Sequence, residues 1–498
     1  MRDAPTRGGC RSQGEEQGWH HPARCARRAV GVHPRGHRVP PDTARSRGAR
    51  SRPSGMPTAS RGSGEMNVND AAVAASSPPP PASDHPLHPR SPGTGRYHGL
   101  DVVRATMMLL GVVIHTALVY CEPQIWIYED PDRTAFAGIL VLAIHIFRMP
   151  AFFVMAGFFG AMLFDRRGPG GFASHRYDRI VLPLVIGWFV IYPLLAWSIS
   201  FAFTWSYLPP EARTIGLAYD RMSLNADFAE AGPMHLWFLY YLVYYYLAFA
   251  TATFLLRRFA GPVAELSRMA FRSLSLGRLR WVGLPAVIVV TSLLMLPMNE
   301  PGIDTTESFW PMWHVIFLYA VYFGIGWLAF GSREIVDHLK NWAWTRFGVG
   351  VMLLVIAVIL GIVTGAAIDA EEAHAQQLFV VNQCLQATTC WILILGITGV
   401  SERMFTRANP SVRYVVDASY WIYLMPLPLT FFIPALFRGW NMWGIVKMPV
   451  MIVLVTTVLL VVYHLAVRGT ALGVLLNGRR YPVWPFTRAR GPEPAPTE

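Results

Sequence analysis

Residues 99–120 read GLDVVRATMMLLGVVIHTALVY, an apolar run that is long enough to cross a hydrocarbon core as one helix. Two ionisable side chains, Arg104 and His115, interrupt this run. Because eleven steps of about 100° bring a helix almost back to its starting angle, both lie on one stripe, about 16 Å apart along the axis. Ionisable groups are costly in a bilayer, so the stripe predicts a polar pathway inside a helix bundle.

The composition around this stretch is that of a polytopic membrane protein. Hydrophobic residues make up 53% of the 498 residues, and charged residues only 15%. Ten apolar segments are long enough to span a bilayer, with approximate limits 98–120, 136–164, 180–203, 234–256, 281–298, 311–330, 347–367, 377–400, 414–437 and 446–467. We therefore predict an all-α integral membrane protein, a bundle of about ten transmembrane helices within residues 98–470.

The N-terminal part of the chain has a different composition. Residues 1–65 carry thirteen arginines and five acidic residues, which accounts for +8 of the formal charge of +12. A segment so poor in apolar residues cannot offset its ordering entropy, so residues 1–97 are predicted to be a disordered tail. An alternative is that translation starts at Met56 or Met66. The remaining body is only mildly basic, and we predict no nucleic-acid partner.

The distribution of lysine and arginine predicts the orientation in the lipid bilayer. Basic loops alternate with acidic ones along the chain, the basic loops being 165–179, 257–280 and 401–413 and the acidic loops 121–134, 299–309 and 367–377. The positive-inside rule places the basic loops and both termini, with the C-terminal tail 471–498, on the cytoplasmic side. The predicted location is a bacterial inner (plasma) membrane. The segment FRGWNMWGIVK, residues 437–447, is an exception that carries two cations on the outer side.

Three further arginines are candidates for chemistry. Arg176 and Arg179, in HRYDRIVLP, are three positions apart at a predicted helix start and would face the same way, as two guanidinium forks that suit phosphate. Ordinary positive-inside anchoring is the alternative for both. Arg148 lies mid-span, with His145 one turn before it and Pro150 two residues after it. A buried arginine needs a partner, and Pro150 can free a backbone carbonyl nearby; a structural counter-charge is the alternative role.

Residues 232–249, GPMHLWFLYYLVYYYLAF, place His235 and Trp237 at the predicted outer membrane surface. Anchoring in an aromatic belt is favoured there over an acceptor-side role in which the ring stacks on a sugar. The five cysteines form no CxxC pair and no metal-ligand spacing, so no metal site is predicted.

Several of these strings together resemble the acyltransferase 3 family of membrane O-acyltransferases. The resemblance covers about residues 96–470 and rests on GLDVVRA leading to His115, FRMPAFFVMAGFF, RYDRI, HLWFL and DASYWIYL. Within the family the strings are most like those of the periplasmic-glucan succinyltransferase branch. One departure is Pro426, which stands in SYWIYLMPLPL where many relatives have a histidine.

The resemblance implies an enzyme that moves an acetyl or succinyl group from cytoplasmic acyl-CoA to a glycan hydroxyl and binds no cofactor. His115 would act as general base, and Arg104 and Arg148 would hold the donor or stabilise negative charge. Arg176 and Arg179 would meet the phosphates of CoA. The main alternative is a transporter or flippase that uses the intramembrane arginines and histidine as a relay, and a third is an inactive relative.

Overall fold

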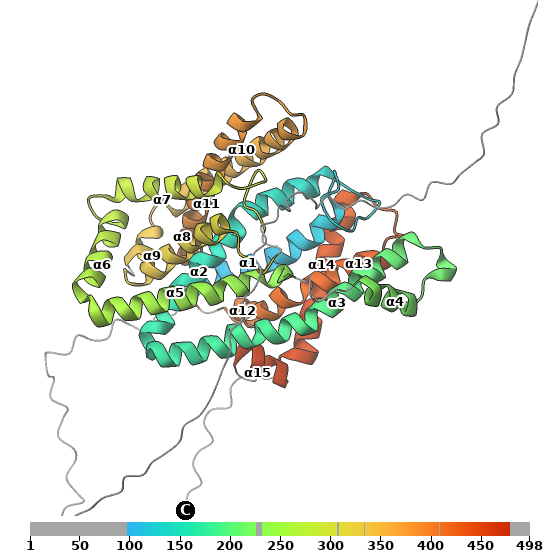
Figure 1. The fold of residues 1–498 in the computed structure, drawn as a ribbon, viewed down its shortest axis with the longest axis horizontal. Helices are drawn as coiled ribbons and strands as arrows, with labels where there is room; N and C mark the ends of the chain where they lie inside the picture. The colour runs from blue at the N-terminus through green and yellow to red at the C-terminus, as the bar shows by residue number, and fades with distance from the viewer. Residues whose placement is uncertain (1–96, 226–231, 306–307, 333, 408, 479–498) are drawn as a thin grey trace, which may run out of the picture. The chain divides into compact units, whose positions relative to one another are not determined.

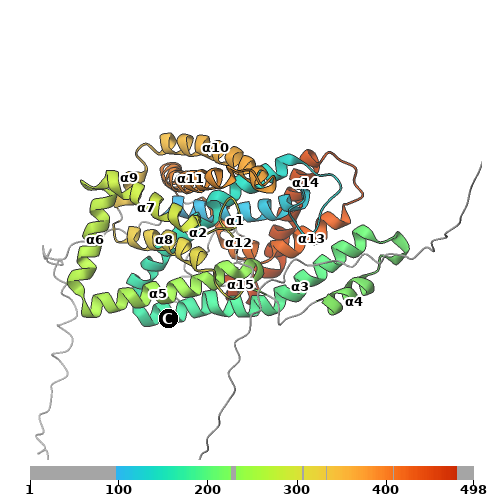
Figure 2. The same cartoon turned by 45° about the horizontal axis from the view of Figure 1, so that its top comes forward.

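The computed structural model describes residues 97–225, 232–305, 308–332, 334–407 and 409–478. Apart from one isolated bridge between two residues, all regular secondary structure within these ranges is helical (Figures 1 and 2). This confirms the predicted all-α class. The predicted disordered tail, apart from Tyr97, and the last part of the predicted C-terminal tail lie outside the described residues.

Most of the membrane body is built by the following helices of the described residues: α1 (His98–Ala117), α2 (Ala135–Arg176), α3 (Leu182–Tyr207), α5 (Trp237–Phe259), α7 (Arg280–Met295), α8 (Trp313–Phe330), α10 (Ala343–Asp369), α11 (Ala375–Met404), α12 (Pro410–Leu424), α13 (Pro426–Leu436) and α14 (Gly444–Val462). The remaining helices are α4 (Ile215–Asn225), α6 (Gly261–Ser275), α9 (Glu334–Leu339) and α15 (Ala471–Asn477). The last of these is a helix where the sequence analysis predicted only a tail.

Helix α1 is the central element of the bundle. It packs against α2, α11, α12, α13 and α14 (Figure 1). Of the most apolar stretch of the α1 span, 56% is buried inside the structure. The corresponding share for α10, which packs mainly on α11, is 22%. Polar side chains on the buried face of α1 therefore meet other helices rather than lipid.

The sequence predicted ten membrane crossings. Counting helices by their length and hydropathy does not confirm that number. Seven helical runs among the described residues qualify, and nine if the bent pairs α6–α7 (100°) and α12–α13 (76°) each count as one crossing. One of the seven is the run 135–207, which contains two of the predicted spans. The chain is a multi-pass membrane protein, and ten crossings remain a prediction.

The predicted basic loop 165–179 is helical over almost all its length. Gly168, with φ 66° and ψ 178°, interrupts α2, and Pro169 starts the next turn, where a proline is tolerated because its missing N–H has no helical partner. After Arg176 a single π-helical turn, η2 (Tyr177–Val181), leads into α3. Reading the glycines and proline of this segment as a loop was therefore wrong.

Small residues allow α2 and α8 to pack closely. A Cβ atom added to Gly157 of α2 would collide with the carbonyl of Phe323, and one added to Gly326 of α8 would collide with the carbonyl of Val154. In a bilayer, where the hydrophobic effect does not draw helices together, such backbone contacts supply much of the attraction. They hold the half of α2 that follows Arg148 in place.

The two cations of segment 437–447, which were predicted to lie on the outer side, both have partners in the structure. Lys447 is fully buried, and its Nζ lies 2.8 Å from Oδ1 of Asp130 and 2.8 Å from Oδ2 of Asp132. Arg438 donates from Nη1 to the carbonyl of Glu129 at 2.6 Å. Burial raises the pKa of Asp130, and the hydrogen bond from Lys447 opposes that shift. The acidic loop before α2 thus offsets the positive charge of segment 437–447, which was an exception to the positive-inside rule.

Candidate active site

The side chain of Arg148, from α2, packs on the face of α1 between Arg104 and His115. Arg148 donates its Nε–H to the carbonyl of Met107 at 3.3 Å. A Cβ atom on Gly111 would lie only 2.8 Å from Nη2 of Arg148, so the guanidinium rests on bare backbone at that position. Gly111 is one helical turn before His115, and Arg148 is an electrostatic neighbour of the His115 ring. A buried cation and an imidazole therefore lie side by side in the bundle.

The partner of Arg148 is not the one that Pro150 suggested. The guanidinium turns to α1, and its other contact is the ring of Phe152, whose centroid is 6.0 Å from Cζ. Its electrostatic neighbours are Tyr423 and Tyr319, and no carboxylate among the described residues pairs with it. A buried cation with no counter-ion is suited to meet negative charge on a ligand.

Two more histidines lie near His115. His145 of α2 and His235, in the 3₁₀ turn η4 (Met234–Leu236), are both its electrostatic neighbours. Nε2 of His145 hydrogen-bonds the carbonyl of Ile303 at 3.0 Å, and Nε2 of His235 that of Leu424 at 3.0 Å. Nδ1 of His115 is buried and has no hydrogen-bond partner in the described part of the chain. The site thus has three imidazoles, of which two are held by backbone carbonyls.

Arg104 and Arg176 approach one aromatic ring nearer the predicted inner surface. Cζ of Arg176 lies 4.2 Å from the centroid of the Tyr246 ring and 5.3 Å from that of Phe172. Arg104 is a second electrostatic neighbour of Tyr246. The fold thus brings together two cations that are far apart in the sequence, on the inner side of Arg148.

Arg179 points to another element. Its Nη1 donates to the carbonyls of Val474 and Leu475 at 3.0 and 2.8 Å, at the C-terminal end of α15. The expectation that Arg176 and Arg179 face the same way is wrong, because the π turn η2 changes the angular spacing of the residues on which the prediction relied. Helix α15, which receives Arg179, had no sequence signal that we recognised.

Trp237 belongs to the core rather than to an interfacial belt. It is buried, and its ring centroid lies 5.5 Å from that of Tyr319, 5.6 Å from that of Tyr241 and 6.2 Å from that of Phe153. A ring enclosed in this way presents no face to a sugar. Of the two predicted acceptor-side residues, the structure brings only His235 close to His115.

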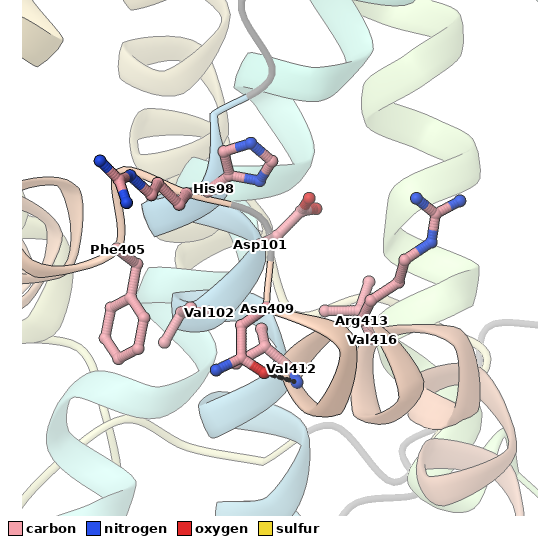
Figure 3. A pocket seen from close by; sticks show the side chains of 9 residues that line it. His98, Asp101, Val102, Phe405, Asn409, Val412, Arg413 and Val416 are labelled. Carbon is pink, nitrogen blue, oxygen red and sulfur yellow. Dashed lines mark hydrogen bonds between the residues drawn. The ribbon is translucent and has the colours of Figure 1, made fainter. Parts of the chain in front are cut away.

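A small pocket that the sequence analysis did not predict opens where α1 begins (Figure 3). The lining residues come from the starts of α1 and α12 and from the segment between α11 and α12: His98, Asp101, Val102, Phe405, Arg407, Asn409, Val412, Arg413 and Val416. Asp101 is one turn from Arg104, so the pocket lies at the end of α1 that was predicted to face the cytoplasm. Its arginines were interpreted only as positive-inside anchors.

The sequence from residue 97 to residue 464 matches the acyltransferase 3 family, described as an acyltransferase domain. The chain belongs to this family. The protein is therefore a membrane acyltransferase that transfers groups other than aminoacyl groups. The match begins at the start of α1, ends in the turn after α14 and includes every site residue described above.

Curated relatives of this acyltransferase include Glucans biosynthesis protein C of Salmonella heidelberg, 24% identical over 389 residues, which cover 77% of this chain and 95% of the relative. The protein of the same name from Escherichia coli is 25% identical over 363 residues, which cover 68% of this chain and 83% of the relative. No solved structure matches this chain.

Gly111→Ala is expected to lower the turnover of this acyltransferase by about 10²-fold, because the new methyl group displaces Arg148 and a shift of about 1 Å at a reacting centre has effects of that size. The measurement is the steady-state rate of acyl transfer at equal amounts of folded protein. Gly365→Ala is the matched control, since nothing lies within 4 Å of a Cβ atom there. Normal turnover of Gly111→Ala would show that the position of Arg148 on α1 is unimportant.

Proposed function

We propose that this enzyme transfers an acetyl or succinyl group from acyl-CoA to a hydroxyl of a cell-envelope glycan. The observation that carries the proposal is the placement of Arg148 on Gly111, beside His115, within the membrane domain of an acyltransferase. The relatives named Glucans biosynthesis protein C support a carbohydrate as the acceptor.

In the proposed reaction His115 acts as general base. Its neutral ring takes the proton of the acceptor hydroxyl as that oxygen attacks the thioester carbonyl. The carbonyl oxygen becomes negative, and the guanidinium of Arg148 stabilises it from α2. The C–S bond then breaks, the thiolate leaves with the proton held by His115, and an ester and free CoA result. This transfer needs no covalent acyl-enzyme.

Arg104 and Arg176 are assigned to the donor. Both lie near Tyr246 on the predicted inner side of Arg148, where the anionic part of acyl-CoA would reside while its thioester reaches His115. Arg179 is reassigned from phosphate binding to holding α15, since its Nη1 already donates to two carbonyls there. The proposed location is a bacterial inner membrane with both termini in the cytoplasm, as the loop charges favour.

The proposed function is tested with purified protein and with cells. Acetyl-CoA and succinyl-CoA are supplied separately with envelope glycans, and CoA release and glycan mass are followed. The glycans of a deletion strain are expected to lack an acyl group that the wild-type gene restores. Glycans of identical mass in the two strains, together with no CoA release in vitro, would refute the proposal.

Arg176→Ala is expected to raise the KM for acyl-CoA about tenfold or more while changing kcat little. A charge-assisted contact contributes on the order of 1.5 to 3 kcal/mol, and binding that is equal in ground and transition states appears in KM. The measurement is steady-state kinetics with acyl-CoA and with a short acyl-pantetheine thioester that lacks the nucleotide.

Arg179→Ala is the comparison for that experiment. It removes the hydrogen bonds to α15, so we expect it to affect both donors alike through the fold. If Arg176→Ala also affected both donors alike, Arg176 would be a structural cation stacked on Tyr246 and the donor assignment would be wrong.

A further inference from the structure

A proline frees a backbone carbonyl where α12 meets α13. In a continuous helix the carbonyl of Leu424 would accept a hydrogen bond from the N–H of residue 428, but Pro428 has none. Pro426 begins α13, and the chain bends by 76° between the two helices. The carbonyl of Leu424 accepts a hydrogen bond from Nε2 of His235 instead, at 3.0 Å.

The same segment holds His235 from both sides. While its ring is bonded to Leu424, its backbone carbonyl accepts a hydrogen bond from the hydroxyl of Tyr423 at 2.7 Å. The rings of His235 and Tyr423 lie 6.1 Å apart between centroids. With its ring and its backbone both fixed, His235 occupies a defined place within electrostatic range of His115.

These contacts determine which ring nitrogen of neutral His235 carries the proton. A carbonyl oxygen can only accept, so Nε2 is the donor and Nδ1 has the lone pair. Nδ1 of His235 is buried and has no hydrogen-bond partner among the described residues. A buried acceptor without a donor is unfavourable unless a ligand supplies one.

We propose that Nδ1 of His235 accepts a hydrogen bond from a second hydroxyl of the acceptor, adjacent to the hydroxyl that reacts at His115. This inference rests on the proposed function and narrows its acceptor to compounds with neighbouring hydroxyls, as in carbohydrates. His235 is thus a positioning residue: it orients the acceptor, and His115 takes the proton. Sequence analysis placed His235 at the predicted outer surface, with an acceptor-side role only as the alternative to anchoring in an aromatic belt.

Two substitutions separate the two ring nitrogens of His235. His235→Gln keeps an N–H that can reach the carbonyl of Leu424 but has no acceptor at the Nδ1 position. His235→Asn keeps an acceptor near the Nδ1 position but cannot reach Leu424. We expect Gln to fold normally and to raise the acceptor KM about three- to tenfold, the effect of losing one neutral hydrogen bond. Asn should retain acceptor affinity and melt at a lower temperature.

The assay compares a glycan that has adjacent hydroxyls with a simple alcohol that has one, using the same acyl-CoA. The effect of His235→Gln should appear with the glycan and not with the alcohol, whereas the donor KM stays unchanged. An unchanged glycan KM in His235→Gln, or equal losses with both acceptors, would overturn the inference. Absence of acyl transfer by the wild-type enzyme would instead refute the proposed function.

Discussion

Replacing His115 with alanine is expected to lower acyl transfer by about 10² to 10⁴-fold, the usual contribution of a general base. The ring lies near Arg148, and its buried Nδ1 has no hydrogen-bond partner among the described residues, so its loss removes the proton acceptor from the site. The measurement is CoA release and glycan acylation at equal amounts of membrane-inserted protein. His115→Asn should be as inactive as His115→Ala, because an amide hydrogen-bonds but does not take the proton.

His374→Ala is the matched control for the loss of a histidine. This residue is exposed in the turn before α11, 2.9 Å from Oε2 of Glu372, and should leave turnover unchanged. Turnover of His115→Asn within a few-fold of wild type would exclude His115 as the base. A collapse of folded protein in both His115 variants would indicate instead that the ring supports the bundle.

Lys447→Ala is expected to lower the free energy of unfolding by about 3 to 5 kcal/mol, the usual result of removing one partner of a buried ion pair. Asp130 is fully buried beside Lys447 and would keep an uncompensated negative charge. Thermal unfolding in detergent micelles measures the change. Activity per folded molecule should be preserved, because the cluster ties the loop before α2 to α14 and contains none of the proposed catalytic groups.

Two further variants test that explanation. Lys340→Ala removes an exposed ion pair with Asp337, for which we expect a change of at most about 1 kcal/mol. The triple variant Lys447→Met, Asp130→Asn, Asp132→Asn removes all the charges together and should recover much of the stability. If the triple variant were no more stable than Lys447→Ala, the lost hydrogen bonds of Lys447, rather than the buried charge or the packing that Met restores, would explain the loss.

Family membership decides between the two classes of function that the ionisable residues of α1 and α2 allowed. Arg104, His115 and Arg148 would serve a proton or anion relay as well as a reaction centre, so residue types alone favoured neither. The match over residues 97–464 assigns the chain to the acyltransferases. Family membership does not say where Arg148 lies. The structure shows that it contacts α1 at Gly111.

The departure at Pro426 acquires a structural meaning from the bent pair α12–α13. Proline is well suited to the first position of a helix, because its missing N–H has no helical partner there. The residue is buried at the bend, two positions from the carbonyl that holds His235. A proline at this position is therefore compatible with an ordered site, because it adds no unsatisfied backbone N–H to the buried bend.

Local periodicity was sufficient to predict the polar stripe of α1 from the sequence. A backbone inside a bilayer must satisfy its own hydrogen bonds, so an apolar run of this length is a helix, and helix geometry sets the angle between Arg104 and His115. For the same reason the all-α class and most of the long helices followed from hydropathy alone. The single π turn after Arg176 was enough to separate Arg176 from Arg179, because a change of period by one residue alters every facing relation beyond it.

The sequence by itself therefore determined the helices and which residues share a face on each of them. Only the tertiary structure decided which faces meet: Arg148 at Gly111, Arg176 over Tyr246, Trp237 inside an aromatic core, and His235 on a carbonyl 189 residues away. Helix period is a local property of the backbone, whereas these contacts depend on how side chains of distant helices fit together. Close packing of that kind leaves no periodic signal in the chain.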